Sequence, residues 1–235
     1  MGVNAQTAVP AFTAGQILTA AQVTQINTGI PVFASTTTRD AAFGGTGEKV
    51  LAQGQYAYIE ATSTLQVYNG TAWVTAISSG LNLITTQTIG TTVASVTVSD
   101  VFSSTYDNYH IIVSGGSASI GINIEMTLGA TATGYYSQLI YGLYGNTPLA
   151  AGAANTTKFT YAGAGYSGGL AMSAFVGSPN LAKATTIGAP VMADGFSGNF
   201  NGTLQNSTQY TAFTLTASTG TMTGGTIFVY GYAKA

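Results

Sequence analysis

From residue 80 to residue 235 the sequence is divided into short segments in which apolar residues alternate with Thr or Ser, as in residues 93–98 and 210–216. Gly, Asn, Ser or Pro separates each segment from the next. Alternation over a few residues is the pattern of a half-buried β-strand. Short strands at regular intervals, without a long helical period, are typical of sandwiches and jelly rolls. We therefore predict a mainly β fold, with an antiparallel β-sandwich or jelly-roll-like domain over residues 80–235.

The expected strands of this domain follow directly from the alternation and the turn residues. They are residues 83–89, 93–98, 108–114, 120–128, 135–144, 157–162, 170–176, 184–192, 196–201, 209–217 and 226–232.

Residues 1–34 form a first zone with one predicted helix over residues 19–28. Thr19 and Gln22 have the spacing of a capping box, and Leu18 and Val23 that of a hydrophobic staple. A helix this short is marginal alone in water, so it needs a surface to pack on. We expect this arm to dock on a neighbour. Its candidate docking residues are Leu18, Val23, Ile26, Ile30 and Phe33.

Residues 35–79 form a second zone, predicted to be a small three-stranded β meander. It opens with Thr36, Thr37 and Thr38, where a Thr cap can start a single helical turn. Asn69-Gly70 between alternating segments is a strong hairpin signal. The module has few apolar residues, so we expect it to need a partner for stability.

Charge is scarce throughout the chain. Five Lys+Arg and seven Asp+Glu make 5% of 235 residues, against about a quarter in an ordinary soluble domain. Five scattered basic residues cannot cover many phosphates, so we expect no nucleic-acid partner. Two explanations of the deficit stay open: a surface solubilised by hydroxyls and amides, or a surface covered by other subunits.

Membrane insertion and secretion are also not expected. Polar residues interrupt every apolar run before the roughly 18 residues of a membrane span. The amino terminus lacks the basic start and apolar stretch of a signal peptide, so we expect synthesis in the cytoplasm without processing.

Residues that could carry chemistry are few. The chain has one histidine, His110, and no cysteine, so we expect no metal site and no cofactor. A Ser-His-Asp triad would need His110 beside one of Asp100, Asp107 or Asp194, and a strand histidine at a surface or interface is the simpler interpretation. Glycosidic cleavage needs two acids, and residues 80–235 supply Asp100, Asp107, Glu125 and Asp194. Glu125 shares a strand face with Asn123 and Thr127, which predicts a solvated residue.

Tyrosine is the residue type with the most to offer for recognition. Aromatic faces with hydroxyl tips can stack on sugar rings or anchor a protein contact, and they can equally complete a core or a subunit interface. The candidates for receptor or subunit contact lie in Gly-rich sequence. They are Tyr135, Tyr136, Tyr141, Tyr144, Tyr161 and Tyr166.

Three stretches together resemble a known class of protein. They are residues 12–33 with the predicted helix, residues 38–74 with Thr38-Arg39-Asp40 and Trp73-Val74, and residues 226–234 at the close of the last strand. They are similar to the attachment segment, a small β module and the closing strand of a terminal sandwich domain in structural proteins of tailed bacteriophages. The likeness is to tail-fibre-like or capsid-appendage proteins of phages of aquatic bacteria.

The resemblance implies a virion component without enzymatic activity. It implies a homo-oligomer, with a trimer as the expected state, whose N-terminal arm binds other virion proteins. A tail fibre or adhesin that contacts a host glycan or protein is the first expected role. The alternatives are a capsid decoration or cement protein and, less in keeping with so few acids, a polysaccharide depolymerase spike.

Overall fold

A computed structural model describes residues 13–20, 23, 29–44, 49–76, 80–145 and 148–234. Strands account for 53% of the chain and helices for 5%, which confirms the predicted mainly β class. None of the described helices is long and apolar enough to cross a membrane.

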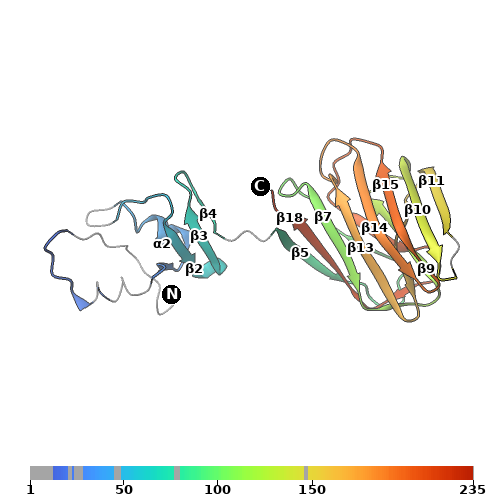
Figure 1. Ribbon diagram of the computed structural model, residues 1–235, viewed down its shortest axis with the longest axis horizontal. Coiled ribbons are helices and arrows are strands. Elements are labelled where there is room, and N and C mark those ends of the chain that lie inside the picture. Colours follow the sequence, from blue (N-terminus) through green and yellow to red (C-terminus); the bar gives the residue numbers. More distant parts are fainter. Residues whose placement is uncertain are drawn as a thin grey trace. The chain divides into compact units, whose positions relative to one another are not determined.

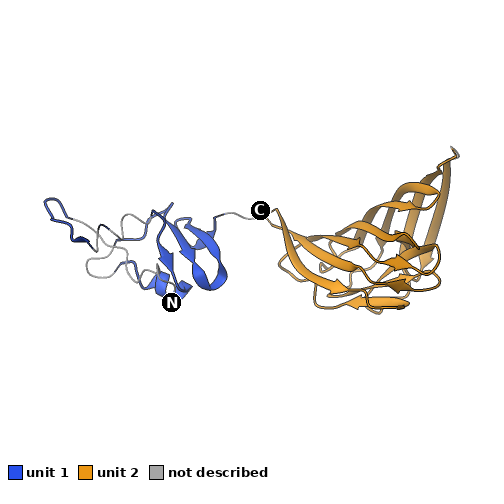
Figure 2. Cartoon of the chain, turned by 90° about the horizontal axis from the view of Figure 1, so that it is seen from below, with its two compact units in different colours: residues 1–78 blue, residues 79–235 orange. Residues whose placement is uncertain are grey.

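The chain divides into two compact units, residues 1–78 and residues 79–235, which Figure 2 shows in blue and orange. We call them unit 1 and unit 2 and describe each by itself.

Unit 1 contains a four-stranded sheet in the order β1-β2-β3-β4. Its elements are β1 (Val32–Phe33), α2 (Thr36–Asp40), β2 (Tyr56–Ile59), the 3-10 turn η1 (Glu60–Thr62), β3 (Thr64–Tyr68) and β4 (Trp73–Thr75). The strands β2, β3 and β4 form the expected antiparallel meander. β1 adds a parallel strand to it, with Phe33 opposite Ile59.

The turns of unit 1 follow from local hydrogen bonds. Ser35, rather than a Thr, caps α2: its hydroxyl accepts from the Thr38 N–H, and the Thr38 hydroxyl oxygen accepts from the Ser35 N–H. This is a capping box whose first residue precedes the three threonines in which the cap was predicted. Between β3 and β4, Asn69 Oδ1 accepts from the N–H groups of Thr71 and Ala72. The side chain of Asn69 thereby closes the hairpin.

Phe33 belongs to the core of unit 1, which corrects its assignment to the docking arm. It is fully buried with Ala42, Ala57 and Ile59, and Phe43 and Trp73 pack against this cluster. A fully buried ring cannot contact a neighbouring protein. Of the predicted helix over residues 19–28, Ala20 and Val23 are helical, and the Val23 N–H donates to the Thr19 carbonyl at 3.0 Å. The rest of that helix lies outside the described residues.

Unit 2 is built from strands that pair antiparallel throughout (Figure 1). They are β5 (Leu81–Thr88), β6 (Ser95–Val98), β7 (Asn108–Ser114), β8 (Ser117–Ala118), β9 (Ile122–Leu128), β10 (Tyr135–Leu143), β11 (Pro148–Thr156), β12 (Phe159–Tyr166), β13 (Gly169–Gly177), β14 (Thr185–Ala193), β15 (Phe196–Leu204), β16 (Phe213–Ala217), β17 (Met222–Thr223) and β18 (Thr226–Tyr232).

Two series of strands meet at β13. One runs β11-β10-β15-β14-β13-β7-β18-β5, and its labelled members follow one another across unit 2 in Figure 1. The other runs β13-β12-β9-β16-β6. The first residues of β13 pair with β12, and its later residues pair with β7 and β14. β13 therefore takes part in both series.

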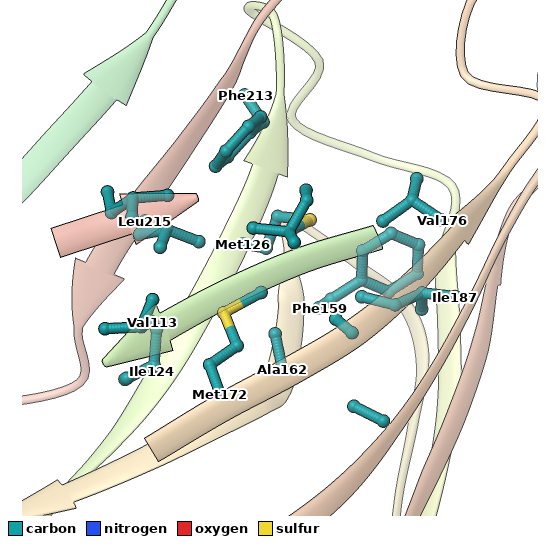
Figure 3. Packing of buried hydrophobic residues seen from close by; sticks show 14 of the residues in the cluster. Val113, Ile124, Met126, Phe159, Ala162, Met172, Val176, Ile187, Phe213 and Leu215 are labelled. Carbon is teal, nitrogen blue, oxygen red and sulfur yellow. The ribbon is translucent and has the colours of Figure 1, made fainter. Parts of the chain in front are cut away.

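One hydrophobic core lies in unit 2, with side chains from both series. Val113, Met172 and Val176 come from the first, and Ile124, Met126 and Leu215 from the second. Figure 3 shows these residues together with Phe159 of β12. Alternation explains how the strands supply them: in β16, Phe213, Leu215 and Ala217 are buried while the intervening threonines are not.

Candidate functional site

The predicted tyrosine cluster separates into buried and exposed members. Tyr135 is fully buried, so it cannot contact a receptor or a second subunit. Its hydroxyl accepts from the Leu128 N–H at 2.8 Å and donates to the Thr131 carbonyl at 3.3 Å. Burial raises the pKa of Tyr135 to about 12. Tyr135 is a core residue of unit 2.

Tyr161 and Tyr141 also serve packing. Both are partly buried against the core. The Tyr141 ring meets Phe196 edge to face at 5.3 Å, and the Tyr161 ring lies 6.2 Å from Phe200. Edge-to-face pairs of this kind add to the stability of a core. Tyr136 is half-buried on the other face of β10.

Tyr144 and Tyr166 remain exposed, at 67% and 39%, on either side of the β14–β15 turn. The Tyr144 hydroxyl donates to the Ala193 carbonyl at 3.1 Å, and its N–H donates to Gly195. Tyr166, at the end of β12, lines a cavity with Ala193 and Asp194. We call this region, made of Tyr141, Tyr144, Tyr166 and residues 193–196, the tyrosine end.

Two hollows flank the turn at the tyrosine end. One, of about 230 Å³, is lined by residues that include Asn123, Tyr166, Asp194 and Phe196. The other, of about 570 Å³, is bordered by Tyr141, Tyr144 and the start of β11. Neither lining contains Lys or Arg, and Asp194 is the acid among the lining residues. Phosphate or carboxylate ligands therefore find no cation here.

Strand register places the tyrosine end opposite the point where the chain enters unit 2. Leu81, the first residue of β5, pairs with Tyr232 of β18. From there antiparallel pairing passes through β7 and β13 to β14, whose last residue Ala193 pairs with Phe196 at the other end of the strands. Side chains at strand ends and turns are free to vary without disturbing the core, so ligand contacts concentrate there.

The chemistry of the tyrosine end suits an uncharged, hydroxyl-rich ligand. Exposed rings can stack on the apolar face of a sugar, or on an apolar side chain of a protein. Asp194 and Asn123 can accept hydrogen bonds from hydroxyl groups. The arrangement is chemically able to bind such a ligand.

One acid of unit 2, Glu125, is buried, although the sequence predicted that it would be solvated. Glu125 is 5% exposed rather than solvated, and Lys158 Nζ lies 2.6 Å from its Oε2. The lysine follows β11 and reaches the face that Glu125 shares with Asn123. Burial of this acid was missed because its partner is distant in sequence. Asp107 pairs with Lys234 at 2.8 Å.

His110 is hydrogen-bonded to a serine on the neighbouring strand. Its Nε2 lies 2.8 Å from Ser173 Oγ, between β7 and β13. Burial lowers the pKa of His110 below its usual value. A catalytic triad also needs a carboxylate on the other ring nitrogen, and Asp107, the candidate nearest in sequence, instead pairs with Lys234. The pair thus serves as a cross-strand contact.

Unit 1 has a cavity of about 760 Å³ that the sequence did not suggest, beside α2, β3 and β4. Arg39 is 6% exposed at its wall, and its guanidinium binds Asp40 at 2.6 Å and Gln66. The same group lies 4.7 Å from the centre of the Trp73 ring. The Arg39 guanidinium thus contacts Asp40, Gln66 and the Trp73 ring, which all belong to unit 1. Through these contacts Arg39 connects α2 to β3 and β4.

The described candidate docking residues are exposed, with the exception of the corrected Phe33. Leu18, Val23 and Ile30 are 39%, 47% and 40% exposed. Ile26 lies outside the described residues. Among the parts of the chain that are described, no group of three or more His, Asp or Glu is placed to hold a metal ion.

A second surface was missed in the sequence although a signal for it exists. Phe228, Tyr230 and Tyr232 alternate with buried Ile227 and Val229 in β18. A strand that is apolar on both faces is usually covered by other parts of a protein on both faces. These rings lie on the outer face of the sheet, opposite the core.

Comparison with protein-family models, with curated proteins and with solved structures found no match to this chain.

Proposed function

We propose that this chain is a non-enzymatic structural protein of a tailed-phage virion, of the tail-fibre or adhesin type. In this proposal the N-terminal region attaches the chain to the particle as part of a homo-oligomer, and unit 2 is displayed for host attachment. The observation that carries the proposal is the tyrosine end. Tyr144 and Tyr166 are exposed there, at the strand ends opposite Leu81, where the chain enters unit 2. A displayed binding surface belongs at that end.

Unit 2 fits a β-sandwich in this proposal. Its two strand series share one core, to which β7 and β13 contribute from one side and β9 and β16 from the other. Two antiparallel sheets with interdigitating inner faces are the usual solution for such a core.

A host glycan without net negative charge is the ligand that we infer for the tyrosine end. Rings and hydrogen-bonding groups are present, while the lining lacks cations. Glycosidic cleavage uses a pair of acids, and Asp194 is the single acid among these lining residues. These features favour binding over cleavage.

A capsid decoration or cement protein is the second candidate. The strands of the β11 to β5 series contain no Asp, Glu, Lys or Arg. Charge-free surfaces suit permanent contacts, because desolvating hydroxyls and amides costs less than desolvating charges.

Phage particles that carry altered copies of the chain distinguish the two roles. We expect the double variant Tyr144→Ala/Tyr166→Ala to give intact particles whose adsorption to host cells is at least about tenfold slower, because central aromatic contacts dominate binding energy. Tyr56→Ala removes a tyrosine that is 45% exposed in unit 1 and is the matched control.

Normal adsorption by the double variant would overturn the adhesin role. Fragile or incomplete particles, with adsorption per intact particle unchanged, would instead support the cement role. A chain without residues 1–28 is expected to be missing from particles under either role.

A further inference from the structure

Among the described residues of unit 2, none covers the outer face of the β11 to β5 series, where Leu83, Phe175 and Met192 are exposed. Along β18, β7 and β13, alternate residues such as Val229, Ile111 and Ala174 point into the core. The residues between them point the other way. We call the outward residues of β5, β18, β7 and β13 the open face. Its apolar members are Leu83, Ile112, Phe175, Phe228, Tyr230 and Tyr232.

Large apolar side chains on the open face are exposed and adjacent. Leu83 is 54% exposed, Phe175 41% and Tyr232 38%. Leu83 pairs with Tyr230, which pairs with His110, which pairs with Phe175 across the four strands. The rings of Phe175 and Tyr232 lie 5.9 Å apart. The open face is therefore one contiguous patch.

The polar groups of the open face are suited to exclusion of water. His110 Nε2 and Ser173 Oγ satisfy each other at 2.8 Å. No residue of β5, β18, β7 or β13 is Asp, Glu, Lys or Arg. Desolvation of charged groups is the main cost of burying a polar surface. Because the open face has no charged residue, burying it does not carry that cost.

The apolar surface continues beyond the open face, with Met192 of β14 and Ile140 of β10 at 59% and 61% exposure. Strands about 4.8 Å apart and residues about 3.4 Å apart give the whole series an outer area of about 900 Å². One partner in a stable protein interface buries about 800 Å². The area matches a protein partner and far exceeds the footprint of a few sugar rings.

We propose that the open face is the surface through which copies of this chain associate. A second copy is the occupant because the open face and its continuation over β14, β15, β10 and β11 offer no charge for a charged partner to complement, and because their combined area meets the need of a stable homo-oligomer. The edge strand β11 also favours association of copies. It has no charged residue, and its Ala/Gly-rich segment is mostly exposed. Proteins that stay monomeric usually avoid such edge strands. The inference rests on the homo-oligomer in the proposed function.

Light scattering on the purified full chain tests this surface. The wild type should have a mass that is a multiple of 23.8 kDa. Leu83→Lys/Phe175→Lys should shift the mass to that of one copy, with an unchanged circular dichroism spectrum, because two ammonium groups cannot be buried without partners. Ile120→Lys changes an apolar residue that is 56% exposed outside the open face and should leave the mass as in wild type.

The two ways of failing are distinguishable. A monomeric wild type would contradict both this inference and the homo-oligomer of the proposed function. A multimer whose mass is the same in the double lysine variant would contradict the open face alone, and would leave the adsorption prediction untouched.

Thiol labelling gives a second readout that adds no charge. The wild type has no cysteine, so Phe175→Cys and Ile120→Cys each introduce a single thiol. In the assembled protein, maleimide should label Cys at position 175 at least about tenfold more slowly than Cys at position 120, and equally fast in denaturant. Equal rates in the native protein would overturn the proposal.

Discussion

The Tyr135 hydroxyl illustrates how a single polar group is accommodated in the core of unit 2. It accepts the Leu128 N–H at 2.8 Å and is fully buried. We expect Tyr135→Phe to lower the free energy of unfolding of unit 2 by about 1–3 kcal/mol, because the Leu128 N–H loses its acceptor in a buried place. Urea unfolding followed by circular dichroism measures the loss. Tyr136→Phe removes a hydroxyl from the adjacent, half-buried residue and should change stability by less than about 0.5 kcal/mol. Equal stability of both variants would show that this hydrogen bond contributes nothing.

The ion pair of Glu125 with Lys158 gives a second prediction for a single residue. Lys158→Met leaves a carboxylate that is 7% exposed without its cation. We expect a loss of about 1–3 kcal/mol in the free energy of unfolding, smaller than for a fully buried pair because the lysine is 39% exposed. The double variant Glu125→Gln/Lys158→Met removes both charges and should recover most of that stability. A double variant as unstable as the single one would show that the loss comes from packing of the lysine stem.

Residue-level reasoning located the tyrosine-rich region but not the roles of its members. Tyr135 and Tyr144 lie in similar Gly-rich sequence, yet one is core and the other is exposed. The difference arises because Tyr135 points toward Phe159, with ring centres 4.8 Å apart, while Tyr144 lies beyond the end of β10. Which face of a strand is covered depends on partners far away in sequence.

Strand bounds were predicted best where β-branched and aromatic residues fill a whole run between turn residues. β7 and β18 have the expected bounds, residues 108–114 and 226–232. β11 was missed because its sequence, rich in Ala and Gly, has little β-propensity. It is held by its pairing with β10. β1 was missed because two residues carry no periodicity, and its parallel pairing with β2 follows from the fold of unit 1.

Arg39 supplies a prediction at the level of elements, because it connects α2 to β3 and β4. We expect Arg39→Met to lower the free energy of unfolding of unit 1 by about 1–3 kcal/mol through loss of its contacts with Gln66 and Trp73. Trp73 is the single tryptophan of the chain, so its fluorescence reports on unit 1. Arg39→Lys keeps the charge without the planar fork and should lie between wild type and Arg39→Met. An unchanged midpoint of the Trp73 transition in Arg39→Met would contradict this role.

At the scale of the whole molecule, the chain has two separate buried clusters, one in each unit, and few charged residues. Unit 1 has a small buried cluster among its described residues, and unit 2 has a large one. The few charges that are described mostly act inside a unit, as with Arg39 and Glu125, rather than on an outer sheet face. The strands of the β11 to β5 series in unit 2 carry no charged residue, and the proposed association of copies depends on this property.

The boundary of the N-terminal arm yields the last prediction. Phe33 is buried in unit 1, and the Pro31 carbonyl accepts the Tyr58 N–H at 2.9 Å. A chain that lacks residues 1–34 loses both contacts, and removing a buried ring costs about 3–5 kcal/mol. That exceeds what so small a core can lose, so we expect unit 1 to be unfolded, with Trp73 emission shifted to the red.

A chain that lacks only residues 1–28 keeps both contacts and should show the Trp73 emission and unfolding midpoint of the full chain. In both truncations the circular dichroism transition of unit 2 should be unchanged, since its core is its own. Identical Trp73 emission in the two truncations would place the boundary of unit 1 after Phe33 and would reinstate the arm as residues 1–34.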